Sequence, residues 1–207
     1  ARAGEVALRS LALGRTVGAD VLLVRPLLLL GNITRAEGRY VESRAYLTEA
    51  LERCRALGDR ANEAIISINL ADVLRGEGDL PGAHRLMDEA LEIATRLGFK
   101  RGMAVALGYL GDIVRDEGNP SEAARIYQAG LLLSQEIGDR SNMSDRMADL
   151  AATAAQLGAH EPATQLFGAT EAFREAFGSP PAQTAWLWSA VGYGAVIEAL
   201  RATLGDE

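Results

Sequence analysis

The sequence predicts an all-α fold built as a solenoid of antiparallel helix pairs, and three residue columns with one 40-residue spacing carry this prediction. Two glycine columns, offset from each other by half a repeat, mark breaks between helices, and a leucine column followed by a small residue marks helix interiors. No stretch alternates apolar and polar residues as a strand would. The columns are Gly18, Gly58, Gly98, Gly138 and Gly178; Gly38, Gly78, Gly118 and Gly158; and Leu30, Leu70, Leu110 and Leu150.

This register divides the chain into a half repeat at 1–20, four full repeats at 21–60, 61–100, 101–140 and 141–180, and a divergent segment at 181–207, expected to be a C-terminal capping helix. An isolated helix pair cannot bury its apolar stripe, so consecutive repeats are expected to stack. The stripe of the second helix follows helical spacing and consists, in the first full repeat, of Leu47, Ala50, Leu51, Cys54 and Leu57.

The last full repeat departs from this pattern. Polar residues enter the stripe there, namely Thr170, Glu171 and Arg174. A terminal repeat has a different neighbour on one side. We therefore expect its apolar face to rotate to Leu166, Ala169, Phe173 and Phe177.

The helix boundaries have specific chemistry. Gly58, like its column partners, suits the left-handed residue that ends a helix. Asp59 and Asp139 follow column glycines and can cap the next helix by accepting from its free N–H groups. Asn119, with Pro120 directly after it, is typical of a helix start. Connections this short favour antiparallel neighbours.

Composition excludes several classes of partner. The 207 residues include 21 Lys and Arg against 28 Asp and Glu, and no basic cluster predicts direct nucleic-acid or anionic-membrane binding. The apolar run at 21–30 is too short for a membrane span and is interrupted by Arg25 and Pro26. The single cysteine, Cys54, cannot form an internal disulfide, which fits the cytoplasm. Because the chain begins without Met and in mid-repeat, we expect it to be part of a longer protein.

The repeats resemble tetratricopeptide repeats in their 40-residue form. The resemblance rests on Leu-Gly at 30–31 and 110–111, Gly-Asp or Gly-Asn at 78–79 and 118–119, and a small residue early in each second helix at Ala83, Ala123 and Ala163. The aromatic residue that the family carries in its first helix is replaced by Leu27, Ser67, Leu107 and Met147. The resemblance implies a right-handed superhelix whose first helices line a concave groove.

A narrower resemblance concerns LGDR at 57–60, IGDR at 137–140, LFGATEAFREAFGSPPA at 166–182 and ALRATLGDE at 199–207. These segments look like the C-terminal repeat region of large bacterial transcriptional regulators, which combine an ATPase module, a tetratricopeptide sensor region and often a LuxR-type DNA-binding domain. The resemblance implies a sensor or interaction region. No phosphate-binding loop of the GxxxxGK[ST] type occurs in the sequence.

The tetratricopeptide resemblance places a polar strip in the concave groove. It consists of Asn32, Asp72 and Asp112, with Arg35, Arg75 and Arg115 one helical turn later. One interpretation is a surface that binds a peptide or a small polar ligand, with arginine favouring carboxylate or phosphate. The alternative is a solvated face whose ion pairs contribute little. The strip is expected to end in the last repeat, where Ala152 and Ala155 hold these columns.

No catalytic residue, cofactor or metal site is predicted. His84 and His160 lie far apart in the sequence without clustered ligands, and no histidine is placed to activate Cys54, which is expected to face inward. Trp186 and Trp188 are expected either to cover the end of the solenoid or to form a docking spot. The predicted function is a non-catalytic scaffold that binds a protein or peptide in the groove. The alternative is a sensor that holds a small-molecule effector through its arginines, and a homodimer is possible.

Overall fold

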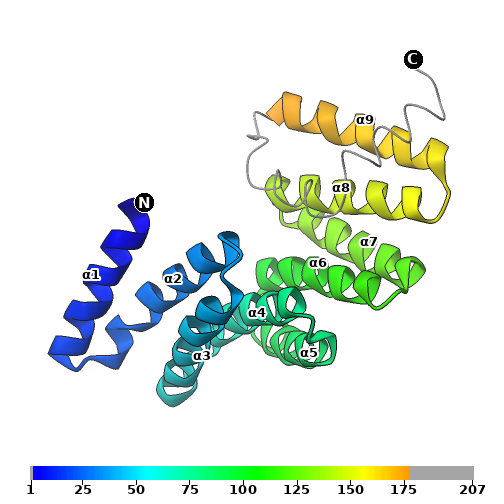
Figure 1. Cartoon of the computed structure of the whole chain (residues 1–207). Helices are drawn as coiled ribbons and strands as arrows, with labels where there is room; N and C mark the ends of the chain where they lie inside the picture. Colours follow the sequence, from blue (N-terminus) through cyan, green and yellow to red (C-terminus); the bar gives the residue numbers. More distant parts are fainter. Residues whose placement is uncertain (1, 178–207) are drawn as a thin grey trace. The chain divides into compact units, whose positions relative to one another are not determined.

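The computed structural model describes residues 2–177, which are helical apart from short turns (Figure 1). No strand occurs in this part of the chain, so the all-α prediction is confirmed. The capping helix expected at 181–207, Gly178, Trp186 and Trp188 lie outside the described residues. The elements are α1 (Arg2–Val17), the 3₁₀ helix η1 (Asp20–Leu22), α2 (Val24–Ala36), α3 (Tyr40–Leu57), α4 (Arg60–Glu77), α5 (Leu80–Arg96), α6 (Lys100–Asp116), α7 (Pro120–Glu136), α8 (Arg140–Gln156) and α9 (His160–Phe177).

The repeat register assigns each helix to one of two types. We call α2, α4, α6 and α8 first helices, and α1, α3, α5, α7 and α9 second helices. In the N-terminal part of the chain α2 packs on α3, α3 on α4 and α4 on α5, and in the C-terminal part α7 packs on α8 and α8 on α9. The chain forms two compact bodies, an N-terminal body (Ala1–Tyr109) and a C-terminal body (Leu110–Glu207), and each is described by itself.

The predicted helix boundaries are confirmed. Both Gly58 (φ 68°) and Gly78 (φ 88°) adopt the left-handed conformation directly after a helix, and the other described members of their columns adopt it within two residues of a helix end. The carboxylate of Asp59 accepts a hydrogen bond from the Asn62 backbone N–H at 3.1 Å, so it caps α4. Equivalent caps are made by Asp79, Asn119 and Asp139 at the starts of α5, α7 and α8.

The second-helix stripe is buried in α3 as predicted, except at its end. Leu47, Ala50, Leu51 and Cys54 are buried, but Leu57 is exposed because it is the last residue of the helix, next to the turn. The stripe therefore ends one turn earlier than its sequence spacing indicated.

The predicted rotation of the stripe in α9 is wrong. Thr170 is fully buried and Arg174 is buried, whereas Ala169 is exposed, and Leu166 and Phe173 are only half-buried. The side chain of Phe177 is outside the described set. Polar residues hold the original face because they find partners there: the Thr170 hydroxyl donates to the Leu166 carbonyl at 2.7 Å, and Arg174 Nε donates to Ser144 Oγ at 2.8 Å.

Close approach between helices of one pair depends on a small residue in the first helix opposite a large one in the second. A Cβ atom on Gly31 would lie 2.6 Å from Leu47 Cδ2, and a Cβ on Gly111 would lie 2.4 Å from Tyr127 Cε1. Real Cβ contacts are essentially never this short. The small residue after each column leucine is therefore a packing requirement, since the large side chain occupies that space.

The first testable prediction is that Gly111→Ala destabilises the C-terminal body by about 1–3 kcal/mol, because its methyl group would overlap the Tyr127 ring. The matched control is Gly168→Ala in α9, where a Cβ meets nothing within 4 Å. That variant should gain roughly 0.5–1 kcal/mol from helix propensity alone. Urea unfolding followed by circular dichroism measures both. Equal changes in the free energy of unfolding of the two variants would show that the Tyr127 ring can move aside at no free-energy cost.

Candidate functional site

In the N-terminal body the predicted polar strip forms ion pairs. Arg75 Nη2 lies 3.0 Å from Asp72 Oδ1 within α4, which is the predicted pairing one turn apart. Arg35 of α2 reaches the other oxygen of Asp72 through its Nη1, so one carboxylate connects two neighbouring first helices. Burial alone would lower the pKa of Arg35, but the Tyr109 phenol and Asp72 outweigh it and raise that pKa.

These residues do not form a solvated face. The side chain of Asp72 is 4% exposed, and those of Arg35 and Arg75 are 15% and 16% exposed. The alternative interpretation of the strip is therefore wrong for this body, because the side chains are enclosed between packed first helices. Pairs this far from water are screened less than surface pairs, and losing one partner leaves a buried charge. A role for these side chains in binding stays a prediction.

The C-terminal body contains a larger polar cluster, of which sequence reasoning identified only part. Arg115 Nη2 pairs with Asp112 Oδ1 at 3.2 Å, as predicted. The hydroxyl of Tyr127 donates to the same Asp112 oxygen at 2.7 Å. The guanidinium carbons of Arg115 and Arg146 lie 5.9 and 5.8 Å from the Tyr127 ring centroid.

Arg146 completes this cluster by pairing with Asp149, with Nη2 and Oδ2 2.8 Å apart. We call Asp112, Arg115, Tyr127, Arg146 and Asp149 the buried charge cluster. All five residues are buried. The sequence contains a signal for Arg146. The earlier repeats hold uncharged residues in its column, namely Pro26, Ile66 and Ala106, so a charged residue there breaks the pattern.

Burial changes the proton affinities in this cluster. It raises the pKa of Asp149 to about 6, although the charge of Arg146 acts in the opposite direction. Burial and the Asp112 carboxylate raise the pKa of Tyr127 above its usual range. Asp145, on the same helix as Arg146, also has a raised pKa because of burial.

Several titratable groups of the described residues are paired or buried. The buried carboxylates pair with arginines, and Cys54 is fully buried with a pKa raised to about 11 by burial, which makes it a poor nucleophile at neutral pH. Its inward orientation is as predicted. No group of three metal-ligating side chains occurs within residues 2–177. His84 is half-buried in α5, and His160 is exposed at the start of α9.

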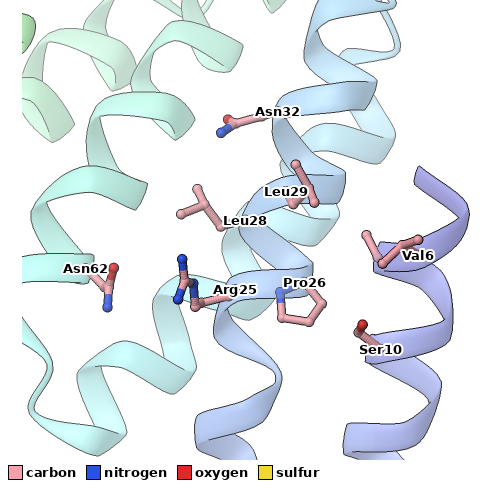
Figure 2. Close-up of a pocket in the computed structure, with 9 residues that line it drawn as sticks. Val6, Ser10, Arg25, Pro26, Leu28, Leu29, Asn32 and Asn62 are labelled. Carbon is pink, nitrogen blue, oxygen red and sulfur yellow. The ribbon is translucent and has the colours of Figure 1, made fainter. Parts of the chain in front are cut away.

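An open hollow of about 680 Å³ lies on the N-terminal body along the exposed side of α2 (Figure 2). Its amide side faces α4 and is formed by Arg25, Leu28, Asn32 and, from α4, Asn62. Of the six residues of the predicted polar strip, Asn32 lines this hollow. Its Oδ1 atom is buried and has no hydrogen-bond partner among the described residues. Sequence reasoning missed Asn62 because its contribution depends on how α2 and α4 pack.

The opposite side of the hollow, which we call the α1 side, is mostly apolar. It is formed by Val6, Ala7 and Ser10 of α1 together with Pro26 and Leu29 of α2. In Figure 2 the side chains of Val6 and Ser10 extend from α1 toward α2. The hollow therefore joins a polar surface to an apolar one across a single helix.

The helices within the described range are too short or too polar for any of them to cross a lipid bilayer.

Comparisons with known proteins support the repeat assignment. Residues 22–96 match the tetratricopeptide repeat family model. BtubC (BKLC) from P. vanneervenii has a similar structure, with a TM-score of 0.72 and 17% identity over 100% of this chain and 92% of that chain. A Rap protein in complex with competence and sporulation factor also has a TM-score of 0.72, at 15% identity over 75% of this chain and 44% of the Rap chain.

A third similar structure is a signal transduction ATPase with numerous domains from Pyrococcus horikoshii, which has a tetratricopeptide repeat sensor. Its TM-score is 0.68, at 17% identity over 97% of this chain and 30% of that one. The comparison with curated proteins gave no match. At these identities the similarity establishes the fold, a tetratricopeptide-like solenoid of helix pairs.

Proposed function

We propose that this chain is a non-catalytic scaffold that binds a protein or peptide segment on the amide side of the hollow. The observation that carries the proposal is the open hollow beside α2, whose amide side is lined by Arg25, Leu28, Asn32 and Asn62. The Oδ1 atom of Asn32 has no donor in the free chain and is closed to water, so a bound partner can donate to it once this side chain turns outward.

The chemistry of this side suits a peptide main chain. The Asn62 amide donates one hydrogen to Asp59 Oδ2 at 2.6 Å and keeps its oxygen and second hydrogen, and Asn32 adds a second amide, which suits the alternating N–H and C=O groups of an extended peptide. Arg25 is exposed beside them and can pair with an acidic side chain or a terminal carboxylate. Leu28 supplies an apolar contact between these polar groups.

The structural comparisons support the same class of function. The similar Rap protein is in complex with competence and sporulation factor, and the similar signal transduction ATPase uses its tetratricopeptide repeats as a sensor. By analogy, we propose that the chain is the sensor or interaction region of a bacterial transcriptional regulator that acts in the cytoplasm. A small-molecule effector is the weaker candidate. It would favour an enclosed pocket, whereas this hollow is open and Arg35 and Arg75 already pair with Asp72.

The proposal predicts that peptides selected from a random displayed library against the whole chain bind about tenfold more weakly to Asn32→Ala, the cost of roughly one hydrogen bond. Fluorescence anisotropy with the selected peptides measures this. Asn32→Ala should keep the stability of the free chain, because its carbonyl oxygen has no partner there to lose. The matched control is Arg9→Ala, an exposed residue of α1 outside the hollow. Peptides that bind Asn32→Ala and Asn62→Ala as tightly as the original chain would contradict the proposal.

A further inference from the structure

Arg25 is the only charged residue among the nine described residues that line the hollow. Its side chain is exposed in the first turn of α2, and its guanidinium makes no hydrogen bond or ion pair with the described part of the chain. Its neighbours in the hollow are apolar or uncharged, with Pro26 and Leu28 close to it in the sequence. The hollow therefore carries one positive charge that no described residue balances.

The acidic residues nearest to Asn62 in the sequence are engaged with other groups. Asp59 accepts hydrogen bonds from the Asn62 backbone N–H at 3.1 Å and from the Asn62 side-chain amide at 2.6 Å, so this carboxylate serves the start of α4. Glu63 is 3% exposed and pairs with two arginines at 3.1 and 2.6 Å. The charge of Arg25 is therefore left for a group that the described residues do not supply.

The column of Arg25 is apolar in the next two repeats. Ile65 of α4 and Val105 of α6 hold the same position, and both are half-buried. Both belong to the N-terminal body, as Arg25 does. Helix packing in this body therefore does not require a cation at this position, which favours a role of Arg25 in recognition.

The amide side of the hollow lies between two described first helices, α2 and α4. Figure 2 shows the side chains of Arg25, Leu28 and Asn32 extending from α2 toward the side on which Asn62 of α4 lies. Recognition on this side does not involve the exposed face of α1. The order along α2 is one cation, one apolar side chain and one amide.

The spacing of these three side chains suits an extended segment that follows α2. Arg25 and Leu28 are one turn apart, about 4.5 Å along the helix axis, and Asn32 lies about 6 Å further. In an extended segment, side chains two residues apart point to the same face and are about 6.6 Å apart. The long side chain of Arg25 can make up the difference of about 2 Å. An acidic residue at Arg25 thus places the second residue along at Leu28 and the main chain beyond it at Asn32.

We propose that the amide side binds an acidic segment of a partner protein, with an Asp or Glu side chain paired with Arg25 and an apolar side chain two residues away in contact with Leu28. This proposal rests on the function proposed above and names the chemistry of the partner. A carboxylate matches the fork of N–H donors that a guanidinium presents. The bound segment covers this pair, so water and salt screen it less than a pair on an open surface.

Selection from a random displayed peptide library tests this chemistry. The peptides are joined to their carrier at the C-terminus, so that only side-chain carboxylates can be selected. Peptides selected on the whole chain should carry Asp or Glu with an apolar residue two positions away, and those selected on Arg25→Glu should carry Lys or Arg instead of the acid. The matched control is Arg85→Glu, which changes an exposed arginine of α5 outside the hollow and should select the same acidic peptides as the original chain.

Fluorescence anisotropy with one selected acidic peptide, and with the same peptide carrying Lys in place of the acid, measures the reversal. Arg25→Glu should bind the acidic peptide about tenfold more weakly than the original chain does, because the ion pair is lost and like charges meet. The Lys peptide should bind Arg25→Glu more tightly than the original chain. Added salt should weaken binding of the acidic peptide to the original chain more than to Arg25→Gln, in which the charge is absent.

The outcomes separate this proposal from the function on which it rests. Peptides that bind Asn32→Ala weakly, but bind the original chain and Arg25→Glu equally, would overturn the acidic partner and leave the amide side as a binding surface. Peptides that depend on neither side chain would contradict both proposals. A dimer of the chain alone in sedimentation, dissociated by Arg25→Glu, would overturn the assignment to a partner protein, because a second copy would then supply the acid.

Discussion

Leu70→Asp should reduce the free energy of unfolding of the N-terminal body by about 4 kcal/mol. Leu70 belongs to the predicted leucine column, is 7% exposed and lies in one core cluster with Leu47 and Val73. Truncating such a side chain costs about 2–5 kcal/mol, and a carboxylate without a partner in that position adds to the loss. The helix lies in the middle of this body, so its neighbours α3 and α5 lose packing together. Urea unfolding followed by circular dichroism gives the change in midpoint.

The matched control for this variant is Val41→Asp, which adds the same charge to the same body. Val41 is 70% exposed in the first turn of α3, where a negative charge interacts favourably with the free N–H groups. The free energy of unfolding of the Val41→Asp variant should stay within about 0.5 kcal/mol of that of the original chain. If both variants unfolded at the same urea concentration, the leucine column would not face the core.

The parts of the fold that the sequence predicted are those fixed by local chemistry. A glycine such as Gly58 adopts a backbone conformation that other residues avoid. The aspartate after it caps the next helix by accepting a hydrogen bond from a backbone N–H three residues on. The stripe in α3 follows from helical spacing for the same reason. These constraints act within a few residues, so they can be recognised without knowing any neighbouring helix.

The errors and omissions concern what surrounds each helix. Polarity at Thr170 and Arg174 suggested a rotated α9, but Thr170 satisfies its hydroxyl on the Leu166 carbonyl of its own helix, and Ser144 of α8 accepts from Arg174 on the original face. Spacing placed Arg75 one turn from Asp72, but the approach of Arg35 from α2 depends on how closely two first helices pack. The amide side of the hollow likewise combines residues of α2 and α4. Periodicity describes the face of one helix and does not identify the groups opposite it.

Arg146→Ala should destabilise the C-terminal body by about 3–5 kcal/mol at neutral pH, the typical cost of removing one partner from a buried ion pair. Asp149 would lose its 2.8 Å partner while remaining buried next to Asp112. The double variant Arg146→Met with Asp149→Leu removes both charges and should recover most of the loss, because an apolar pair of similar volume needs no compensation. A double variant as unstable as Arg146→Ala would show that lost packing, and not the unpaired carboxylate, causes the effect.

The pH dependence of this loss separates the two causes further. Burial raises the pKa of Asp149 from 3.8 to about 6, so this group favours the folded body below pH 3.8 and loses that contribution as the pH rises through 6. Without Arg146, whose charge holds this pKa down against Asp112 and Asp145, the pKa rises further and protonation at pH 5 removes the uncompensated charge. The deficit of Arg146→Ala relative to the original chain should therefore be smaller at pH 5 than at pH 7 in urea unfolding, and the double variant should show no such change. A deficit of equal size at both pH values would mean that Asp149 is not the group that Arg146 compensates.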